Sequence, residues 1–179
     1  EEIIKSQEIK NLSTAIGVLP GNNDLSGLRY GKICILADAD SDGLHIATLL
    51  CALFLRHYKS LVKDGRIFIA MPPLYRIDCG KEVLYALDEK QKDDVVREFR
   101  NKKGKPKINI QRFKGLGEMN PEELWSTTLD PNTRNLLQVK YSKDTTKDQK
   151  LIHTLMGSDV SLRKDFIISN AINVQNLDI

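Results

Sequence analysis

Three aspartates at alternate positions, Asp38, Asp40 and Asp42, are the residues whose types and spacing most directly suggest chemistry. They follow a short apolar run, residues 33–37, that is rich in β-branched side chains, and an apolar segment with helical periodicity comes next. The pattern predicts a strand, a tight acidic turn and a helix. Ligands of open α/β sheets usually bind at the carboxyl ends of such strands. Gly43 would permit a backbone turn that a residue with a Cβ resists.

The spacing of these aspartates suggests a site for a divalent cation. Alternate residues of an extended segment point to the same side, so the carboxylates of Asp38 and Asp40 can converge. Carboxylates held close together repel each other unless a cation joins them. Mg²⁺ typically takes one or two protein carboxylates and completes its shell with water and phosphate oxygens. The sequence therefore predicts a magnesium site that uses Asp38, Asp40 and Asp42.

Other interpretations of the same turn compete with a magnesium site. The pattern D-x-D-x-D-G also opens a calcium-binding EF-hand loop, but such a loop needs a glutamate at its twelfth position, which is Leu49 here. The spacing alone also allows a phosphatase that uses Asp38 as a nucleophile. The simplest alternative is a solvated acidic helix start that favours the helix dipole.

Several long motifs resemble one protein family. One stretch reads LADADSDGLHIATLLCALFLRHY and resembles the Toprim core of bacterial type IIA topoisomerase B subunits, which include those of topoisomerase IV and gyrase. The segments MPPLYRID, QRFKGLGEMNPEELWSTTLDP and FIISNAINVQNLDI match the same family in the same order. The core is more similar to topoisomerase IV and the C-terminal tail to gyrase, so the choice between relaxation or decatenation and negative supercoiling stays open.

The resemblance implies an enzyme that cuts one DNA duplex and passes a second duplex through the break. It implies that ATP binds in a separate N-terminal domain, and that the nucleophile is a tyrosine of a partner A subunit in an A2B2 heterotetramer. The Toprim domain supplies Mg²⁺: Asp38 would contact both metal positions, Asp40 the second, and Asp42 would assist. The protein would act in the bacterial cytoplasm, associated with the nucleoid.

One family motif is absent from this sequence. The family's Toprim domain begins with a strand that ends in E-G-D-S-A, whose glutamate is the general acid/base and a metal ligand, and no such motif occurs here. Glu118 cannot replace it, because it belongs to a different matched motif. We therefore assign no catalytic residue within this chain, and expect a C-terminal piece that lacks one carboxylate and one sheet strand and is inactive alone.

Basic residues in several places are candidates for DNA contacts. Lysines 102, 103, 105 and 107 form the densest cluster, in a loop that could equally be a solvated surface. A strand end followed by glycines would let a lysine approach a phosphate closely, and a histidine follows the acidic turn within reach of a bound phosphate. Together with the resemblance, these patterns select the DNA-binding candidates His45, Arg112, Lys114 and Arg163.

The order of predicted elements indicates an α/β fold: a Toprim, Rossmann-like parallel sheet flanked by helices, with a C-terminal α-helical tail. We place the Toprim domain at residues 1–141, truncated at its N-terminus, and the tail at residues 142–179. Trp125 is expected to anchor a core. The other predicted elements are a helix at 44–63 with two covered sides, a strand at 66–70, a hairpin at 74–78 and 82–87, a helix at 88–101, strands at 108–113 and 136–141, and helices at 145–156 and 158–169.

Composition sets outer limits on the class of protein. The 179 residues suffice for one domain with a small appendage, and the net charge of +3 does not by itself indicate nucleic acid. Three cysteines without C-x-x-C spacing predict reduced, packed thiols and a cytoplasmic protein. No apolar run approaches the ~20 residues that span a bilayer, so no membrane partner is expected. Two alternatives remain: a non-catalytic binding module on the same fold, or another Toprim enzyme such as a primase, which QRFKGLGEMNP disfavours.

Overall fold

The computed structural model describes residues 3–102 and 106–173, and the chain forms two compact units. The first unit combines residues 1–29, 51–65 and 140–179, and the second unit combines residues 30–50 and 66–139. The two units group residues 1–29 and 51–65 with residues 140–179, and the predicted division into a Toprim domain and a tail after residue 141 stays a prediction. Each unit is described by itself.

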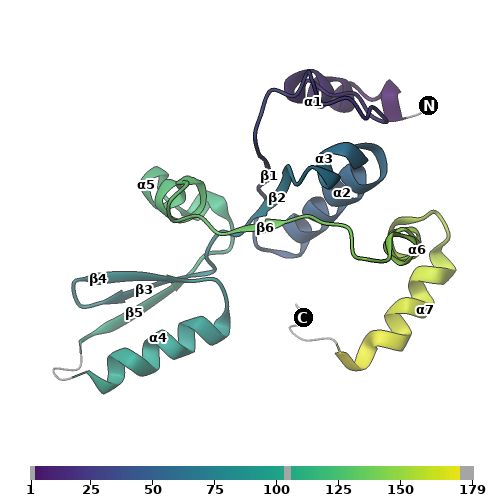
Figure 1. The fold of residues 1–179 in the computed structure, drawn as a ribbon. Coiled ribbons are helices and arrows are strands. Elements are labelled where there is room, and N and C mark those ends of the chain that lie inside the picture. Colours follow the sequence, from purple (N-terminus) through teal and green to yellow (C-terminus); the bar gives the residue numbers. More distant parts are fainter. Residues whose placement is uncertain (1–2, 103–105, 174–179) are drawn as a thin grey trace. The chain divides into compact units, whose positions relative to one another are not determined.

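A three-stranded sheet in the second unit carries the predicted parallel pair. Strands β1 (Ile33–Ile35) and β2 (Ile67–Ala70) are parallel, with Ile33 opposite Ile67, and β6 (Leu136–Gln138) is antiparallel to β2, giving the order β1-β2-β6 (Figure 1). Among the described residues β1 is therefore an edge strand. Cys34 is exposed at this edge, so the prediction that its thiol is packed was wrong.

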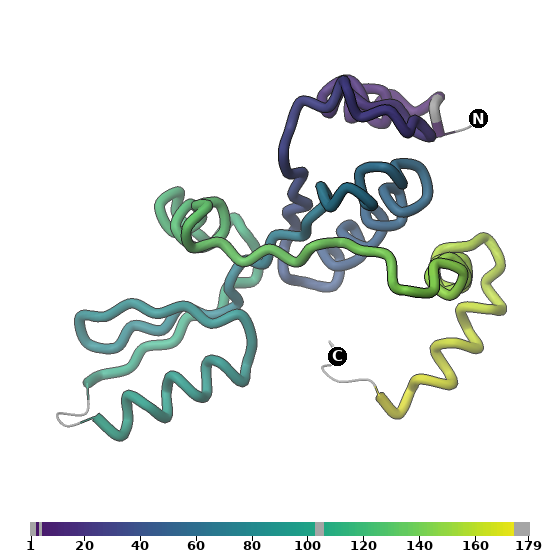
Figure 2. The backbone as a smooth tube through the Cα atoms, viewed as in Figure 1, coloured from purple at the N-terminus to yellow at the C-terminus, as the bar shows by residue number. Residues whose placement is uncertain are grey.

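A second three-stranded sheet in the same unit is antiparallel throughout. Strands β3 (Tyr75–Cys79), β4 (Glu82–Ala86) and β5 (Ile108–Arg112) lie in the order β4-β3-β5, and helix α4 (Glu89–Asn101) runs along one face of this sheet (Figures 1 and 2). Ile77 of β3 packs with Val96 and Phe99 of α4 in a small apolar core. The predicted hairpin, helix and strand are confirmed, while Lys103 and Lys105 of the basic loop lie outside the described residues.

The helix predicted at 44–63 is two helices, α2 (Ser41–His57) and α3 (Lys59–Lys63). The helical course breaks at Tyr58, where the backbone takes φ −125° and ψ 47° and the side chain is completely buried. The expectation that the first turns are covered on two sides was also wrong. Leu44, Ile46 and Leu49 are 63%, 52% and 46% exposed in the described structure.

Helices dominate the first unit. They are α1 (Gln7–Ile16), preceded by a 3₁₀ turn at Ile3–Lys5, then α3, α6 (Thr145–Met156) and α7 (Val160–Asn170), with a further turn at Ala171–Asn173. Ser6 caps the start of α1 by accepting a hydrogen bond from the Ile9 N–H, and Gly17 ends that helix in the left-handed conformation at φ 84°. The two predicted C-terminal helices are thus confirmed.

A short helix, α5 (Pro121–Leu124), continues into a π-helical turn at Trp125–Leu129. Asn120 and Glu123 form a capping box that fixes the start of α5. Trp125 is 55% exposed, so its prediction as a core anchor was wrong, and the buried residue of the turn is Thr128.

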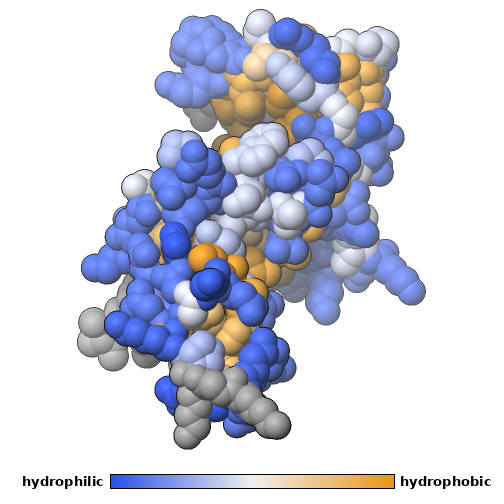
Figure 3. Space-filling view, turned by 90° about the vertical axis from the view of Figure 1, so that its left-hand side faces the viewer, coloured by the Kyte–Doolittle hydropathy of each residue, from blue (hydrophilic) through white to orange (hydrophobic). Residues whose placement is uncertain are grey.

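The face of the molecule seen in Figure 3 is largely hydrophilic and is interrupted by apolar patches.

The buried hydroxyls of Ser13 and Tyr58 are hydrogen-bonded to each other at 2.8 Å and join α1 to the start of α3. We expect Ser13→Ala to lower the free energy of unfolding by about 1–3 kcal/mol, because it leaves the Tyr58 hydroxyl buried without a partner. Ser13 also donates to the Ile9 carbonyl at 2.7 Å. Thr14→Ala is the matched control, since Thr14 donates in the same way to the Lys10 carbonyl at 2.9 Å but is exposed. Urea unfolding followed by circular dichroism measures both, and equal midpoints would contradict the prediction.

Candidate functional site

The acidic turn between β1 and α2 is shaped by two backbone contacts. The Oδ1 atom of Asp40 accepts a hydrogen bond of 2.7 Å from the Gly43 N–H, so Asp40 caps the start of α2. This cap explains why the helix begins at Ser41, earlier than predicted. A Cβ on Gly43 would lie 2.0 Å from the carbonyl oxygen of Asp38. Gly43 is therefore required by this close approach, and it is not among the glycines with positive φ.

A second turn, residues 114–118, follows β5 and is closed on itself. Phe113 is 4% exposed and its N–H donates to the Leu74 carbonyl at 2.9 Å, which fixes the end of the strand. The Lys114 N–H then donates to Oε2 of Glu118 at 2.9 Å, across a 3₁₀ turn at Leu116–Glu118. We call residues 114–118 the glycine turn, because Gly115 and Gly117 lie in it.

The acidic turn and the glycine turn are in direct contact. The Leu116 N–H donates to Oδ1 of Asp38 at 2.7 Å, although the two residues are 78 positions apart in the sequence. A Cβ on Gly115 would lie 3.2–3.3 Å from the carboxyl atoms of Asp38, so the glycine also leaves room for this carboxylate. Two motifs that the sequence shows separately thus form one site.

Asp38 and Asp40 are the candidate ligands for a divalent cation in this turn. Asp38 and Asp40 each accept a backbone hydrogen bond through Oδ1, and neither of these two bonds uses Oδ2. Throughout residues 3–102 and 106–173, no three His, Cys, Asp or Glu side chains form a group that could hold a metal ion. Mg²⁺ itself can be held by one or two protein carboxylates, with waters completing its shell.

Three of the predicted DNA-binding residues, His45, Arg112 and Lys114, are exposed and lie in the second unit with the acidic turn. His45 is in the first turns of α2. Arg112 and Lys114 flank the buried Phe113, and residues two apart on an extended segment point to the same side. Arg112 ends β5 and Lys114 begins the glycine turn, so both exposed cations lie at the end of this strand, and their contact with DNA stays a prediction.

Arg163, the fourth DNA-binding candidate, lies in the first unit on α7. Its Nη2 donates to the Gly157 carbonyl at 3.2 Å, at the corner between α6 and α7. Its Nε is buried and has no hydrogen-bond partner among the described residues. The side chain therefore supports the corner between the two helices, and its contact with DNA stays a prediction.

An ion-pair network in the second unit holds α5, which directly follows the glycine turn. Arg76 on β3 pairs with Asp78 at 2.9 Å and with Glu123 of α5, and these hydrogen bonds raise the pKa of the guanidinium. Glu123 also accepts from the Asn120 N–H in the capping box. The network therefore fixes α5, and with it the end of the glycine turn, to the antiparallel sheet.

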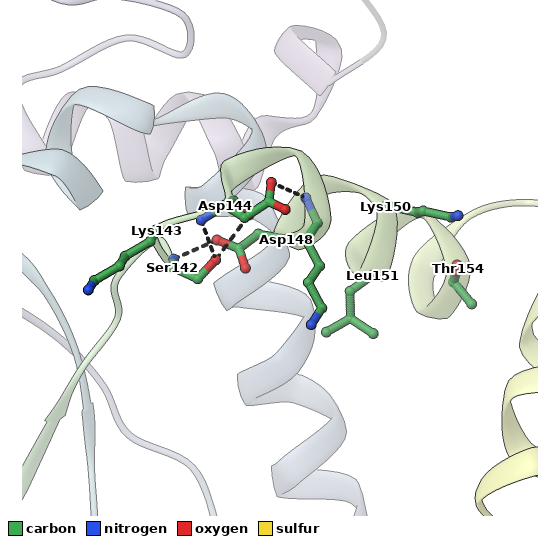
Figure 4. A pocket seen from close by; sticks show the side chains of 8 residues that line it. Ser142, Lys143, Asp144, Asp148, Lys150, Leu151 and Thr154 are labelled. Atoms are coloured by element: carbon green, nitrogen blue, oxygen red, sulfur yellow. Dashed lines mark hydrogen bonds between the residues drawn. The ribbon is translucent and has the colours of Figure 1, made fainter.

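A hollow in the first unit lies around the start of α6. Asp144 accepts from the N–H groups of Thr146 and Lys147, and Asp148 accepts from the Ser142 N–H at 2.6 Å (Figure 4). Lys143 and Lys150 point away from each other (Figure 4). The hydrogen bonds around the hollow are those that cap the start of α6. The residues that line the hollow are Ser142, Lys143, Asp144, Lys147, Asp148, Lys150, Leu151 and Thr154.

Sequence reasoning did not identify Gly115 and Leu116 as partners of Asp38. Their position just after a strand end and before a second glycine was a usable signal that a backbone N–H would be presented there. Nothing in the sequence indicated that Asp38 would accept this hydrogen bond, because sequence spacing does not show which distant turn lies opposite.

Comparison with known proteins identifies the family. The family described as DNA gyrase B subunit, carboxyl terminus, matches residues 105–168, which include the glycine turn. The B subunit of DNA topoisomerase 4 from Haemophilus influenzae is 57% identical over 169 residues, 94% of this chain and 25% of that protein. The Escherichia coli protein of the same name is 65% identical over 139 residues, 78% of this chain and 22% of that protein. The B subunit of DNA gyrase from Thermotoga maritima is 44% identical over 180 residues, all of this chain and 28% of that protein.

The chain belongs to the B-subunit family of bacterial type IIA topoisomerases. It spans about a quarter of the length of the curated B subunits that it matches. The family resemblance drawn from the motifs is confirmed, as is an α/β fold. Within the part of the chain that the structure describes, no helix has the length and apolar character needed to cross a membrane.

The close approach of Gly43 to Asp38 leads to a stability prediction. Gly43→Ala should lower the free energy of unfolding by roughly 1–3 kcal/mol, as for other overpacked sites, because its Cβ would overlap the Asp38 backbone. Gly31→Ala is the control, since nothing lies within 4 Å of a Cβ at that position in the same unit. Thermal melting of the two variants should separate them, and equal melting temperatures would refute the steric argument.

Proposed function

We propose that this chain is the Mg²⁺-binding Toprim part of an ATP-dependent type IIA topoisomerase B subunit, which assists the cleavage and religation of double-stranded DNA. The observation that supports this most directly is the contact between Asp38 and the glycine turn. It brings a carboxylate suited to Mg²⁺ next to the strand end that carries Arg112 and Lys114. A metal ligand beside cations that can bind phosphate is an arrangement suited to chemistry on a phosphodiester.

The residues of this chain take separate roles in the proposal. Asp38 and Asp40 hold Mg²⁺ through their remaining carboxylate oxygens, and Asp42 contributes negative charge nearby. When bound, the cation stabilises charge on the scissile phosphate and on the departing 3′ oxygen. Arg112, Lys114 and His45 bind backbone phosphates and hold the strand in position. These contacts fix the position of the DNA without reading its sequence.

Other components complete the proposed enzyme. The tyrosine nucleophile belongs to a partner A subunit, ATP binds in another domain of the B subunit, and the assembly is an A2B2 heterotetramer in the cytoplasm, at the nucleoid. We propose decatenation and relaxation as its reactions, supported by the higher identity to topoisomerase 4 subunits than to gyrase subunits. Comparison of decatenation with negative supercoiling by the reconstituted enzyme tests this choice.

One observation favours a second candidate function, a DNA-binding module without a metal. No group of three metal-binding side chains is present within the described residues. The complete B subunit with its A subunit distinguishes the two functions. The enzyme requires that Asp38→Asn abolish DNA cleavage, whereas a bare binding module requires that cleavage be unaffected.

The metal assignment predicts that Mg²⁺ raises the melting temperature of this chain, because an ion that binds only the folded state stabilises it by mass action. The affinity should be weak, in the millimolar range, since few protein oxygens bind the ion. Asp38→Asn should remove this stabilisation more completely than Asp42→Asn. The measurement is thermal melting against Mg²⁺ concentration at constant ionic strength.

Either of two results would refute the metal assignment. One is an equal Mg²⁺ response in Asp38→Asn and the parent chain. The other is tight Mg²⁺ binding by the parent, which would require a complete ligand cage.

The DNA assignment predicts binding that weakens steeply with salt and shows little sequence preference, because phosphate contacts release counterions. Lys114→Ala should reduce the slope of log K against log salt concentration by about 0.9, the amount expected for one lost contact to B-DNA. Lys90→Ala, an exposed lysine of α4, is the control and should leave the slope unchanged. Fluorescence anisotropy over a salt series measures both, and salt-independent binding would rule out a phosphate-dominated interface.

A further inference from the structure

The carboxylate of Asp38 is oriented by a backbone N–H from a distant turn. Asp38 is exposed, and its Oδ1 accepts the Leu116 N–H at 2.7 Å. A carboxylate that accepts a hydrogen bond from a fixed backbone donor loses rotational freedom, and such charge-assisted bonds are short and directional. The donor therefore determines which oxygen of Asp38 remains for another ligand.

Gly115 leaves space for the Asp38 carboxylate, whereas its own backbone conformation does not require a glycine. Its φ of −167° and ψ of 171° are extended values that any residue adopts. A Cβ there would meet Cγ, Oδ1 and Oδ2 of Asp38 at 3.2, 3.2 and 3.3 Å. Gly117, in the same turn, has nothing within 4 Å of a Cβ. The two glycines therefore form a natural comparison, because only one of them faces Asp38.

The glycine turn, which presents the Leu116 N–H, is stabilised by hydrogen bonds within the turn. The Glu118 N–H donates to the Gly115 carbonyl at 3.2 Å, and the Met119 N–H donates to the Leu116 carbonyl at 3.2 Å. The Glu118 carboxylate accepts from the Lys114 N–H, and the buried Phe113 fixes the entrance of the turn. The Leu116 N–H is thus held by a rigid turn.

We propose that the Gly115–Leu116 peptide is a positioning element for Asp38. Leu116 orients the carboxylate by a hydrogen bond, and Gly115 provides the space in which it lies. The inference rests on the proposed function, because the oriented carboxylate is the proposed Mg²⁺ ligand. Neither residue contacts the cation, and both act through Asp38. Outer partners of this kind typically change metal affinity by about 10–100-fold when they are altered.

The test compares Gly115→Ala with Gly117→Ala in the 179-residue chain. The first measurement is hydrogen exchange at the Leu116 amide by NMR without Mg²⁺. The second is the Mg²⁺ concentration that gives half of the thermal stabilisation. In Gly115→Ala we expect the Leu116 amide to lose its protection from exchange. We also expect half of the thermal stabilisation to need at least about 10-fold more Mg²⁺ than in the parent. Gly117→Ala should match the parent in both measurements.

Parent-like protection and Mg²⁺ response in Gly115→Ala would overturn the inference. If Gly115→Ala does not fold, Asp38→Asn decides, because a neutral amide accepts the Leu116 hydrogen bond more weakly. Protection at Leu116 should then fall in Asp38→Asn and not in Asp42→Asn, and equal protection would overturn the inference. A different result refutes the proposed function: a full Mg²⁺ response in Asp38→Asn. Loss of that response in Asp38→Asn together with a parent-like Gly115→Ala refutes the positioning role alone.

Discussion

The hydrogen bond from the Leu116 N–H to Asp38 is the interaction on which the candidate site depends. It closes a loop of 78 residues between the end of β1 and the end of β5, which belong to different sheets of the same unit. It joins the acidic turn directly to the turn that follows the basic strand end. With it, a carboxylate, a backbone donor and two exposed cations share one place in the fold.

The acidic turn balances charge repulsion against backbone donors. Three aspartates in five residues would repel one another, yet the structure gives two of them a backbone N–H partner. The donor for Asp40 is at the start of α2, where unpaired N–H groups and the helix dipole favour negative charge. The turn can therefore form without a cation while it keeps carboxylate oxygens for one. The proposed metal site and an ordinary helix cap can therefore occupy the same residues.

The wrong predictions concern which apolar faces are covered. Periodicity correctly placed α4, α6 and α7, because a helical pattern follows from local side-chain spacing. It did not show that Leu44, Ile46 and Leu49 are exposed, that Trp125 lies outside the core, or that the helix breaks at Tyr58. Each of these depends on what packs against the segment. The break at Tyr58, for example, accompanies a buried hydroxyl contact with Ser13, 45 residues earlier.

By itself, the sequence determined the elements, the two site motifs and the family. These follow from local features: strand and helix periodicity, the spacing of Asp38, Asp40 and Asp42, and long motifs such as QRFKGLGEMNP. Only the tertiary structure decided that Asp38 faces Gly115 and Leu116, that Gly43 is needed for a close backbone approach, and that Arg163 is engaged with the carbonyl of Gly157. The physical reason is the same in each case. A backbone N–H or carbonyl is present at every non-proline residue, so sequence cannot show which one a side chain will meet until the chain has folded.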